Sequence, residues 1–132
     1  MSKSVRVSVL LALAGPWAFV QAACPPAAAD GKQLQQGDVL LAWRTEPATL
    51  QVGEPFVMTV TVCPSAASLR RVDASMPEHR HGMNYKPSLQ PLGDGRWRVD
   101  GMLWHMAGRW ELRWDLLNGQ TTEVLRDSVT LR

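Results

Sequence analysis

The chain has 132 residues, with 14 Lys or Arg, 12 Asp or Glu and three His, so the formal net charge at pH 7 is only +2. This near balance gives no electrostatic reason to expect binding to nucleic acid or to an anionic membrane surface. The length suits one domain with a core of ordinary size, and the sequence contains no internal repeat and no sign of a second domain.

The first 22 residues have the three-part pattern of a secretory signal peptide. Lys3 and Arg6 form a short basic start, residues 7–20 are mostly apolar, and small or apolar residues lead up to Ala22. The apolar run is short for a membrane span. We therefore predict cleavage after Ala22, no retained transmembrane span and a periplasmic location. The alternative is that this segment stays as an uncleaved anchor. Loss of Lys3 and Arg6 would bring the net charge to zero.

Residues 23–38 include a stretch rich in Pro and Ala without periodicity, and we predict that they form an irregular lead-in to a domain at 39–132.

The chain has two cysteines, Cys24 and Cys63. In an oxidising compartment an even number favours a disulfide. Such a disulfide would close a loop of roughly 40 residues and stabilise the fold by about 3–4 kcal/mol in the chain-entropy model. The alternative is that Cys63 is a thiolate metal ligand.

The remaining sequence predicts β-strands separated by turns that contain Pro or Gly. Residues 56–63 give a clear strand, because β-branched residues dominate an alternating pattern. Further strands are predicted at 39–44, 69–76, 87–94, 96–106, 109–116 and 121–131. No stretch has a convincing helical period. Six or seven short strands in a domain of this size predict an all-β fold, an antiparallel β-sandwich.

Two predicted strands have assignable faces. In 109–116 the residues expected to point inward are Trp110, Leu112, Trp114 and Leu116, with charged residues between them. In 96–106 one face would carry Trp97, Val99, Gly101, Leu103 and His105. The other face would carry Arg98, Asp100, Met102, Trp104 and Met106.

All three histidines lie beside methionines in two short stretches, MPEHRHGMNY at residues 76–85 and the pair at residues 105–106. Thioether sulfur is a soft ligand that suits Cu(I), and imidazole binds Cu(I) and Cu(II). Zinc prefers Cys, His or carboxylate, and calcium and magnesium prefer oxygen. We therefore predict a copper site, with the candidate ligands Met76, His79, His81, Met83, His105 and Met106.

The spacing of these residues supports a shared site. His79 and His81 are two residues apart, so an extended backbone would point both rings to one face, and Met83 continues the pattern. Pro77 ends the preceding strand and leaves a ligand-bearing loop. His105 and Met106 would face opposite sides of a regular strand. Both remain candidates because a bulge or the turn at 107–108 can re-aim one of them.

Each of these residues also has an ordinary structural interpretation. Met76 and Met106 could be core methionines, and the segment around His79 and His81 could be a solvated loop. Glu78 could be a ligand or a solvated carboxylate. Trp104 could cover the site by a cation–π contact or could belong to the core.

The strings VGEPFVMTVTVCP, VDASMPEHRHGMNYKP and GRWRVDGMLWHMAGRWELRWDLLNG span most of residues 52–132. The specific elements are MPEHRHGM and the later HMAGRWEL. With these strings the chain resembles the small exported domains called YtkA-like or FixH-like. The resemblance implies an immunoglobulin-like β-sandwich, periplasmic or membrane-tethered, linked to copper handling or to cytochrome oxidase assembly.

Two functions follow as predictions. The first is a periplasmic copper-binding protein that stores copper or delivers it to a partner by ligand exchange. The second is a metal-free module that binds an exported or membrane enzyme of the oxidase type, with the loop at 76–85 and Trp104 as its recognition surface. The sequence contains no nucleophile in a recognisable catalytic frame and no Gly-rich phosphate loop, so we do not expect an enzyme.

Overall fold

The computed structural model describes residues 31–132, and within this range the chain forms nine β-strands and no helix. The strands are β1 (Lys32–Gln36), β2 (Val39–Glu46), β3 (Pro55–Cys63), β4 (Ser68–Met76), β5 (His81–Gly82), β6 (Ser88–Gly93), β7 (Arg96–Leu103), β8 (Gly108–Asn118) and β9 (Thr121–Leu131). The predicted signal peptide, the first half of the predicted lead-in and Cys24 lie outside the described residues.

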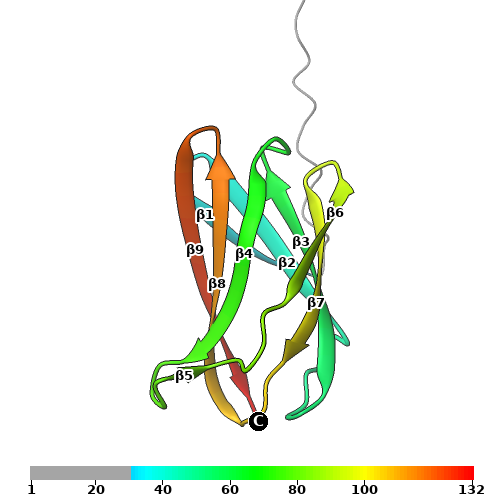
Figure 1. The fold of residues 1–132 in the computed structure, drawn as a ribbon, viewed down its shortest axis with the longest axis vertical. Coiled ribbons are helices and arrows are strands. Elements are labelled where there is room, and N and C mark those ends of the chain that lie inside the picture. Colours follow the sequence, from blue (N-terminus) through cyan, green and yellow to red (C-terminus); the bar gives the residue numbers. More distant parts are fainter. Residues whose placement is uncertain (1–30) are drawn as a thin grey trace, which may run out of the picture.

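The strands form two antiparallel sheets that face each other (Figure 1). One sheet has five strands in the order β1-β2-β3-β7-β6, and the other has four in the order β5-β4-β8-β9. This confirms the predicted all-β, antiparallel architecture of the sandwich type. No helix within the described residues is long and apolar enough to cross a membrane.

The core fills the space between β3 and β8, because both strands alternate apolar and polar residues. Every second residue of β3 from Phe56 to Val62 is buried, and so is every second residue of β8 from Trp110 to Leu116. The predicted inward face of 109–116 is thus confirmed. Since burying one large apolar side chain stabilises a fold by about 1.5–3 kcal/mol, these eight positions contribute much of the driving force for folding.

Two strands were not predicted. β1 lies inside the segment predicted to be an irregular lead-in, so that prediction is wrong for Lys32–Gln36. Its residues are Lys, Gln and one half-buried Leu, which give no alternating signal. The strand is positioned instead by pairing with β2, by an ion pair from Lys32 to Asp127 and by the Lys32 ammonium 5.4 Å from the centre of the Trp43 ring. The other unpredicted strand is the two-residue β5.

The predicted faces of 96–106 are wrong after Gly101. This glycine has a φ of +84°, and the pairing of β7 with β3 shifts register between Val99 and Met102. As a result Val99 and Met102 both point into the core, and the next inward residue is Trp104. β7 ends at Leu103, so His105 and Met106 lie in the loop to β8.

Three loops meet at one end of the molecule, the lower end in Figure 1. They are the β2–β3 loop, the β4–β5 loop and the β7–β8 loop. The Gly53 N–H donates a 2.8 Å hydrogen bond to the Trp104 carbonyl and so joins the first loop to the third. We call the surface formed by residues 77–83 and 105–107 the histidine end, because it carries all three histidines.

Cys63 lies at the opposite end of β3 and is disulfide-bonded. A disulfide sulfur is not a thiolate, so the alternative of Cys63 as a thiolate metal ligand is wrong. Position alone also argues against that role. Pro55 pairs with Leu103 next to the histidine end, and Cys63 is about 26 Å further along the same strand.

Candidate metal centre

The three imidazole rings form a row at the histidine end. The His81 ring lies between the other two, with its centroid 5.8 Å from that of His79 and 5.2 Å from that of His105. His79 and His81 come from the β4–β5 segment, whereas His105 comes from the β7–β8 loop. The fold therefore brings together the two stretches that the sequence singled out.

The β4–β5 segment is a tight hairpin rather than an extended loop. Pro77 follows the last residue of β4, and the His79 N–H donates to the Met76 carbonyl at 3.1 Å, which closes the turn. Arg80 has a φ of +55° and reverses the chain. β5 then pairs back on β4, with His81 opposite Met76. The expected extended backbone from His79 to His81 is therefore wrong, although the turn still leaves the two rings adjacent.

Trp110 forms the floor beneath two of these rings. Its indole makes edge contacts with His81, at 6.3 Å between centroids and 71° between planes, and with His105, at 5.5 Å and 79°. Its Nε1–H donates a 3.0 Å hydrogen bond to the Met106 carbonyl. Trp110 thus touches both histidine-bearing segments and fixes the backbone of the β7–β8 loop. Sequence reasoning assigned it only to the core.

Trp104 packs face to face on Trp110. The two indoles stack with 5.4 Å between centroids and only 5° between planes, and Phe56 meets Trp104 edge-on at 5.2 Å. Trp104 is fully buried. Of the two interpretations of Trp104, the structure therefore supports the core residue. The aromatic residue in contact with the histidines is Trp110.

The methionines occupy different environments. Met76 is fully buried, and its Cε would lie 2.7 Å from a Cβ placed on Gly108, so it packs directly against the glycine backbone. Met83 is half-buried and packs against the core. Met106 has 37% of its surface exposed beside His105. The core interpretation therefore applies to Met76 and not to Met106.

Two features bear on whether a metal fits here. A tetrahedral ion bonded to two imidazoles at about 2 Å would hold the ring centroids about 5 Å apart, close to the separations of His81 from its neighbours. The Nδ1 atom of His105 is buried without a hydrogen-bond partner. Water, a ligand or an ion can satisfy a buried polar atom of this kind, and the indole nitrogens of Trp43, Trp104 and Trp114 share this environment.

The described part of the chain contains no group of three or more His, Cys, Asp or Glu side chains arranged to hold a metal ion. An ion at this position would therefore use fewer than three such donors in the described arrangement. Thioether sulfur or water would complete its coordination. Among these donors, thioether sulfur suits copper better than zinc.

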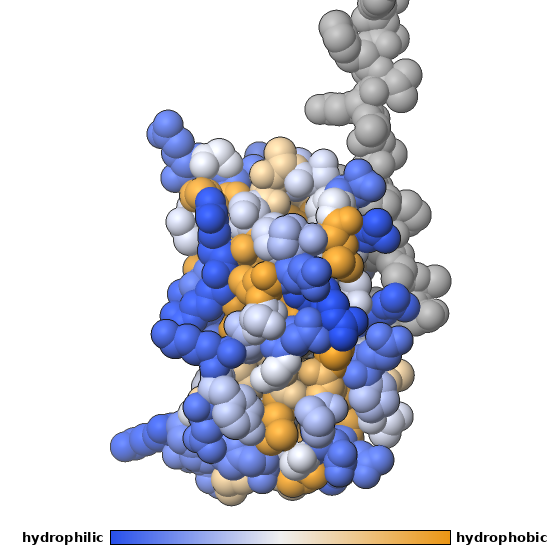
Figure 2. Space-filling view, turned by 45° about the vertical axis from the view of Figure 1, so that its right-hand side comes forward, coloured by the Kyte–Doolittle hydropathy of each residue, from blue (hydrophilic) through white to orange (hydrophobic). Residues whose placement is uncertain are grey.

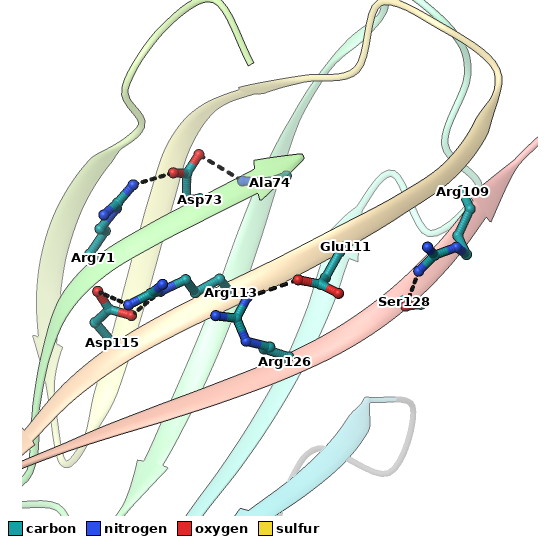
Figure 3. Close-up of polar contacts among 9 residues, drawn as sticks. All are labelled: Arg71, Asp73, Ala74, Arg109, Glu111, Arg113, Asp115, Arg126 and Ser128. Carbon is teal, nitrogen blue, oxygen red and sulfur yellow. Dashed lines mark hydrogen bonds and ion pairs between the residues drawn. The ribbon is translucent and has the colours of Figure 1, made fainter. Parts of the chain in front are cut away.

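Glu78 forms an ion pair with Arg109 of β8, with 2.7 Å between Oε1 and Nε. Both side chains are largely exposed, and the hydrogen bond from Arg109 lowers the pKa of the Glu78 carboxyl. Arg109 also donates to the Ser128 Oγ at 3.4 Å, so β9 helps to position the guanidinium (Figure 3). Sequence reasoning missed this partner because it lies on a different strand, far away in the chain.

No family model matches this chain, and no curated protein or solved structure matches it significantly. The resemblance to the YtkA-like and FixH-like domains therefore stays a prediction. Any function must be inferred from the residues and their arrangement.

Proposed function

We propose that this protein is a periplasmic copper-binding protein that holds copper at the histidine end and stores it or delivers it to a partner. The observation that carries the proposal is the row of three imidazoles, with centroids 5.8 and 5.2 Å apart, assembled from two segments far apart in the sequence. Met106, the residue that follows His105, has 37% of its surface exposed.

The proposed ligands fall into two groups. His79, His81, His105 and Met106 are at least partly accessible at the histidine end, so we place them first. Met83 is half-buried nearby, and Met76 supports the hairpin from the core. Because the first group is partly exposed, the ligands of a partner could replace them one at a time, which is the mechanism that delivery by ligand exchange requires.

Export and family membership belong to the same proposal. The pattern of residues 1–22 supports cleavage of a signal peptide and a periplasmic location. The two facing antiparallel sheets are compatible with an immunoglobulin-like sandwich of the YtkA-like or FixH-like type. A compartment outside the cytosol also lacks the thiol pool that competes for copper inside cells.

A second candidate is a metal-free module that binds an exported or membrane enzyme of the oxidase type. Apolar side chains reach the surface among polar ones at the lower end of the molecule (Figure 2). Val52 and Met106 are 42% and 37% exposed, on the two loops joined by the Gly53–Trp104 hydrogen bond. Exposed apolar groups within a polar surface are typical of contact sites for other proteins.

The test is copper binding by the mature protein from Ala23 onward. Cu(I) is titrated without oxygen against a chromogenic chelator, and Cu(II) is titrated separately, with H79A/H81A and H105A variants alongside. A Met58→Leu variant, altered in a core methionine of β3, is the control for general effects of substitution. We expect one ion per chain, lost in the histidine variants and retained in the control.

Binding no tighter than the chelator background would contradict the copper function, as would binding that H79A/H81A leaves unchanged. In that case, retained folding and partner binding in a metal-stripped sample would favour the metal-free module.

A further inference from the structure

The two sheets are open to the outside where β1 begins. β1 pairs with β2 no further than Lys32 opposite Trp43, whereas β2 runs on to Glu46 and β9 runs on to Leu131. Lys32 bridges the sheets at this point, because its ammonium forms an ion pair with Asp127 of β9 at 3.6 Å. Beyond this bridge no strand within residues 31–132 covers the space between the end of β2 and the end of β9.

A cavity of about 710 Å³ lies in this opening. Its walls are the end of β2, the first residues of the β2–β3 loop, the start of β1 and the end of β9. Sites for small organic molecules in proteins have volumes of about 300–1,000 Å³, and they combine apolar walls with a few polar groups. The cavity therefore has the size of a site for a small molecule.

The base of this cavity is apolar. Trp43 and Leu131 line it and are only 6% and 4% exposed, and the half-buried Leu50 and Val129 line it as well and pack against the core. These side chains belong to three different elements that are already packed together, so the base exists before any ligand binds. An apolar group placed here would leave water at a favourable free energy.

The charged side chains that line the cavity are mostly cationic. One carboxylate, Glu46, stands against three basic groups, those of Lys32, Arg44 and Arg132. Arg44 is exposed and forms no ion pair with the described residues, in contrast to Arg98 and Arg113, whose guanidinium groups are bonded to carboxylates. The guanidinium of Arg44 therefore has its donors free for an anion.

Lys32 places a positive charge beside the apolar base. Its ammonium lies 5.4 Å from the centre of the Trp43 ring. An ammonium has three N–H donors. Even with one directed to Asp127 and one to the Ser128 carbonyl, a third remains for a ligand.

We propose that this cavity binds a small organic anion, a carboxylate with an aromatic or aliphatic body. The body packs on Trp43 and Leu50, and the carboxylate accepts hydrogen bonds from Arg44 and Lys32. The site uses none of the proposed copper ligands, so this activity is additional to the proposed function and stands or falls separately from it.

The test is binding of phenylbutyrate by the mature protein, followed by heteronuclear NMR and by calorimetry. Phenylbutyramide has nearly the same shape without the charge and is titrated alongside. R44Q removes one proposed anion contact, and its matched control is R96Q, since Arg96 is also exposed on the five-stranded sheet and does not line the cavity.

A second variant blocks the cavity without altering the core. Ala48 is exposed in the β2–β3 loop and lines the cavity, so A48W would fill part of it. Its matched control is A66W, in the exposed β3–β4 loop away from the cavity. Circular dichroism and urea unfolding verify that each variant folds.

We expect one phenylbutyrate per chain, with shifts in the signals of the Trp43 indole and of Thr45. R44Q and the use of the amide should each weaken binding by about tenfold, because a hydrogen bond to a charged group is lost. A48W should abolish binding, and R96Q and A66W should leave it unchanged.

Three results would overturn the inference: no binding of phenylbutyrate by the wild-type protein, equal affinity for phenylbutyrate and its amide, or binding that A48W leaves intact. Each of them leaves the proposed copper function untouched, because the copper titration does not involve this cavity.

Discussion

Trp110 is the residue that joins the parts of the histidine end. It contacts His81 from one segment and His105 from the other, and it donates a hydrogen bond to the Met106 carbonyl. A rigid aromatic side chain in this position fixes the distance between the segments before any ion binds. Ligands held in place in advance bind more tightly, since less conformational freedom is lost on binding.

We predict that W110F weakens Cu(I) binding by up to about tenfold, because one neutral hydrogen bond contributes about 0.5–1.5 kcal/mol and here it positions the Met106 backbone. W114F is the matched control. Trp114 lies on the same inward face of β8, is also fully buried, and its Nε1 has no partner. The measurement is chelator competition, with urea unfolding of both variants alongside. Equal effects of W110F and W114F on affinity would contradict the positioning role.

We also predict that the carboxyl of Glu78 titrates below the usual range of a glutamate. The hydrogen bond from Arg109 favours the charged form and lowers the pKa. A lowered pKa means that the pair stabilises the folded protein above the ordinary glutamate pKa, and that this contribution is lost as the pH falls through the folded value. Carboxyl NMR shifts of the metal-free protein measure the titration. The midpoint should return to the ordinary range in R109Q, and an unchanged midpoint there would assign the shift to another cause.

At the scale of single elements, the sequence predicted a strand wherever alternation was regular. β8 is predicted with its faces because Trp, Leu and charged residues alternate without interruption from Trp110 to Leu116. β1 is missed because its residues are polar and its position depends on β2. The faces of β7 are half wrong because one glycine, Gly101, shifts the register in a way that alternation does not reveal.

In the candidate site, too, residue types could be predicted from the sequence, whereas contacts between strands could not. The histidines and methionines could be named from the sequence because their types and spacing are unusual. The floor formed by Trp110 and the ion pair between Glu78 and Arg109 could not be found, because each depends on partners brought close only by strand pairing. Burial likewise separates Met76 from Met106, although the two look equivalent in sequence.

The close packing of Met76, at the end of β4, against Gly108, at the start of β8, can be tested by mutation. Gly108 has a φ of +126°, and a Cβ there would lie 2.7 Å from the Cε of Met76. We predict that G108A lowers the free energy of unfolding by about 1–3 kcal/mol through strain and overpacking.

M76L, which lacks the terminal methyl group, should recover part of that loss in the double variant G108A/M76L. Urea unfolding of the four proteins in this cycle measures the coupling between the two positions. Strictly additive effects would mean that backbone strain alone is responsible and that the contact with Met76 contributes nothing.

At the scale of the whole molecule, the disulfide and the histidine end occupy opposite ends of the sandwich. Cys63 is the last residue of β3, and Pro55 at its start pairs with Leu103 next to the histidine end. We predict that C24S/C63S lowers the free energy of unfolding by about 3–4 kcal/mol, the value expected for a loop of this size. Its copper stoichiometry and affinity should match the wild type. Chemical unfolding and chelator competition measure the two effects, and a lost copper site in a folded variant would contradict the separation.

The outer face of the four-stranded sheet is lined by charged pairs (Figure 3). Arg113 bonds to Asp115 on β8, and Arg126 of β9 bonds to Glu111. Exposed pairs of this kind add little stability individually, but they keep this face hydrated. The exposed Met106 lies instead in the β7–β8 loop at the end of the sandwich.

The stacked indoles of Trp104 and Trp110 also have an optical consequence. Two indoles with 5.4 Å between their centroids are close enough for their ultraviolet transitions to interact, so the pair should contribute to the circular dichroism and emission of the protein. Trp110 also touches His81 and His105, so an ion at these rings would alter the circular dichroism and the emission of the pair. Comparison with W110F, which keeps the Trp43–Trp114 pair, would isolate the part of this signal that reports on the histidine end.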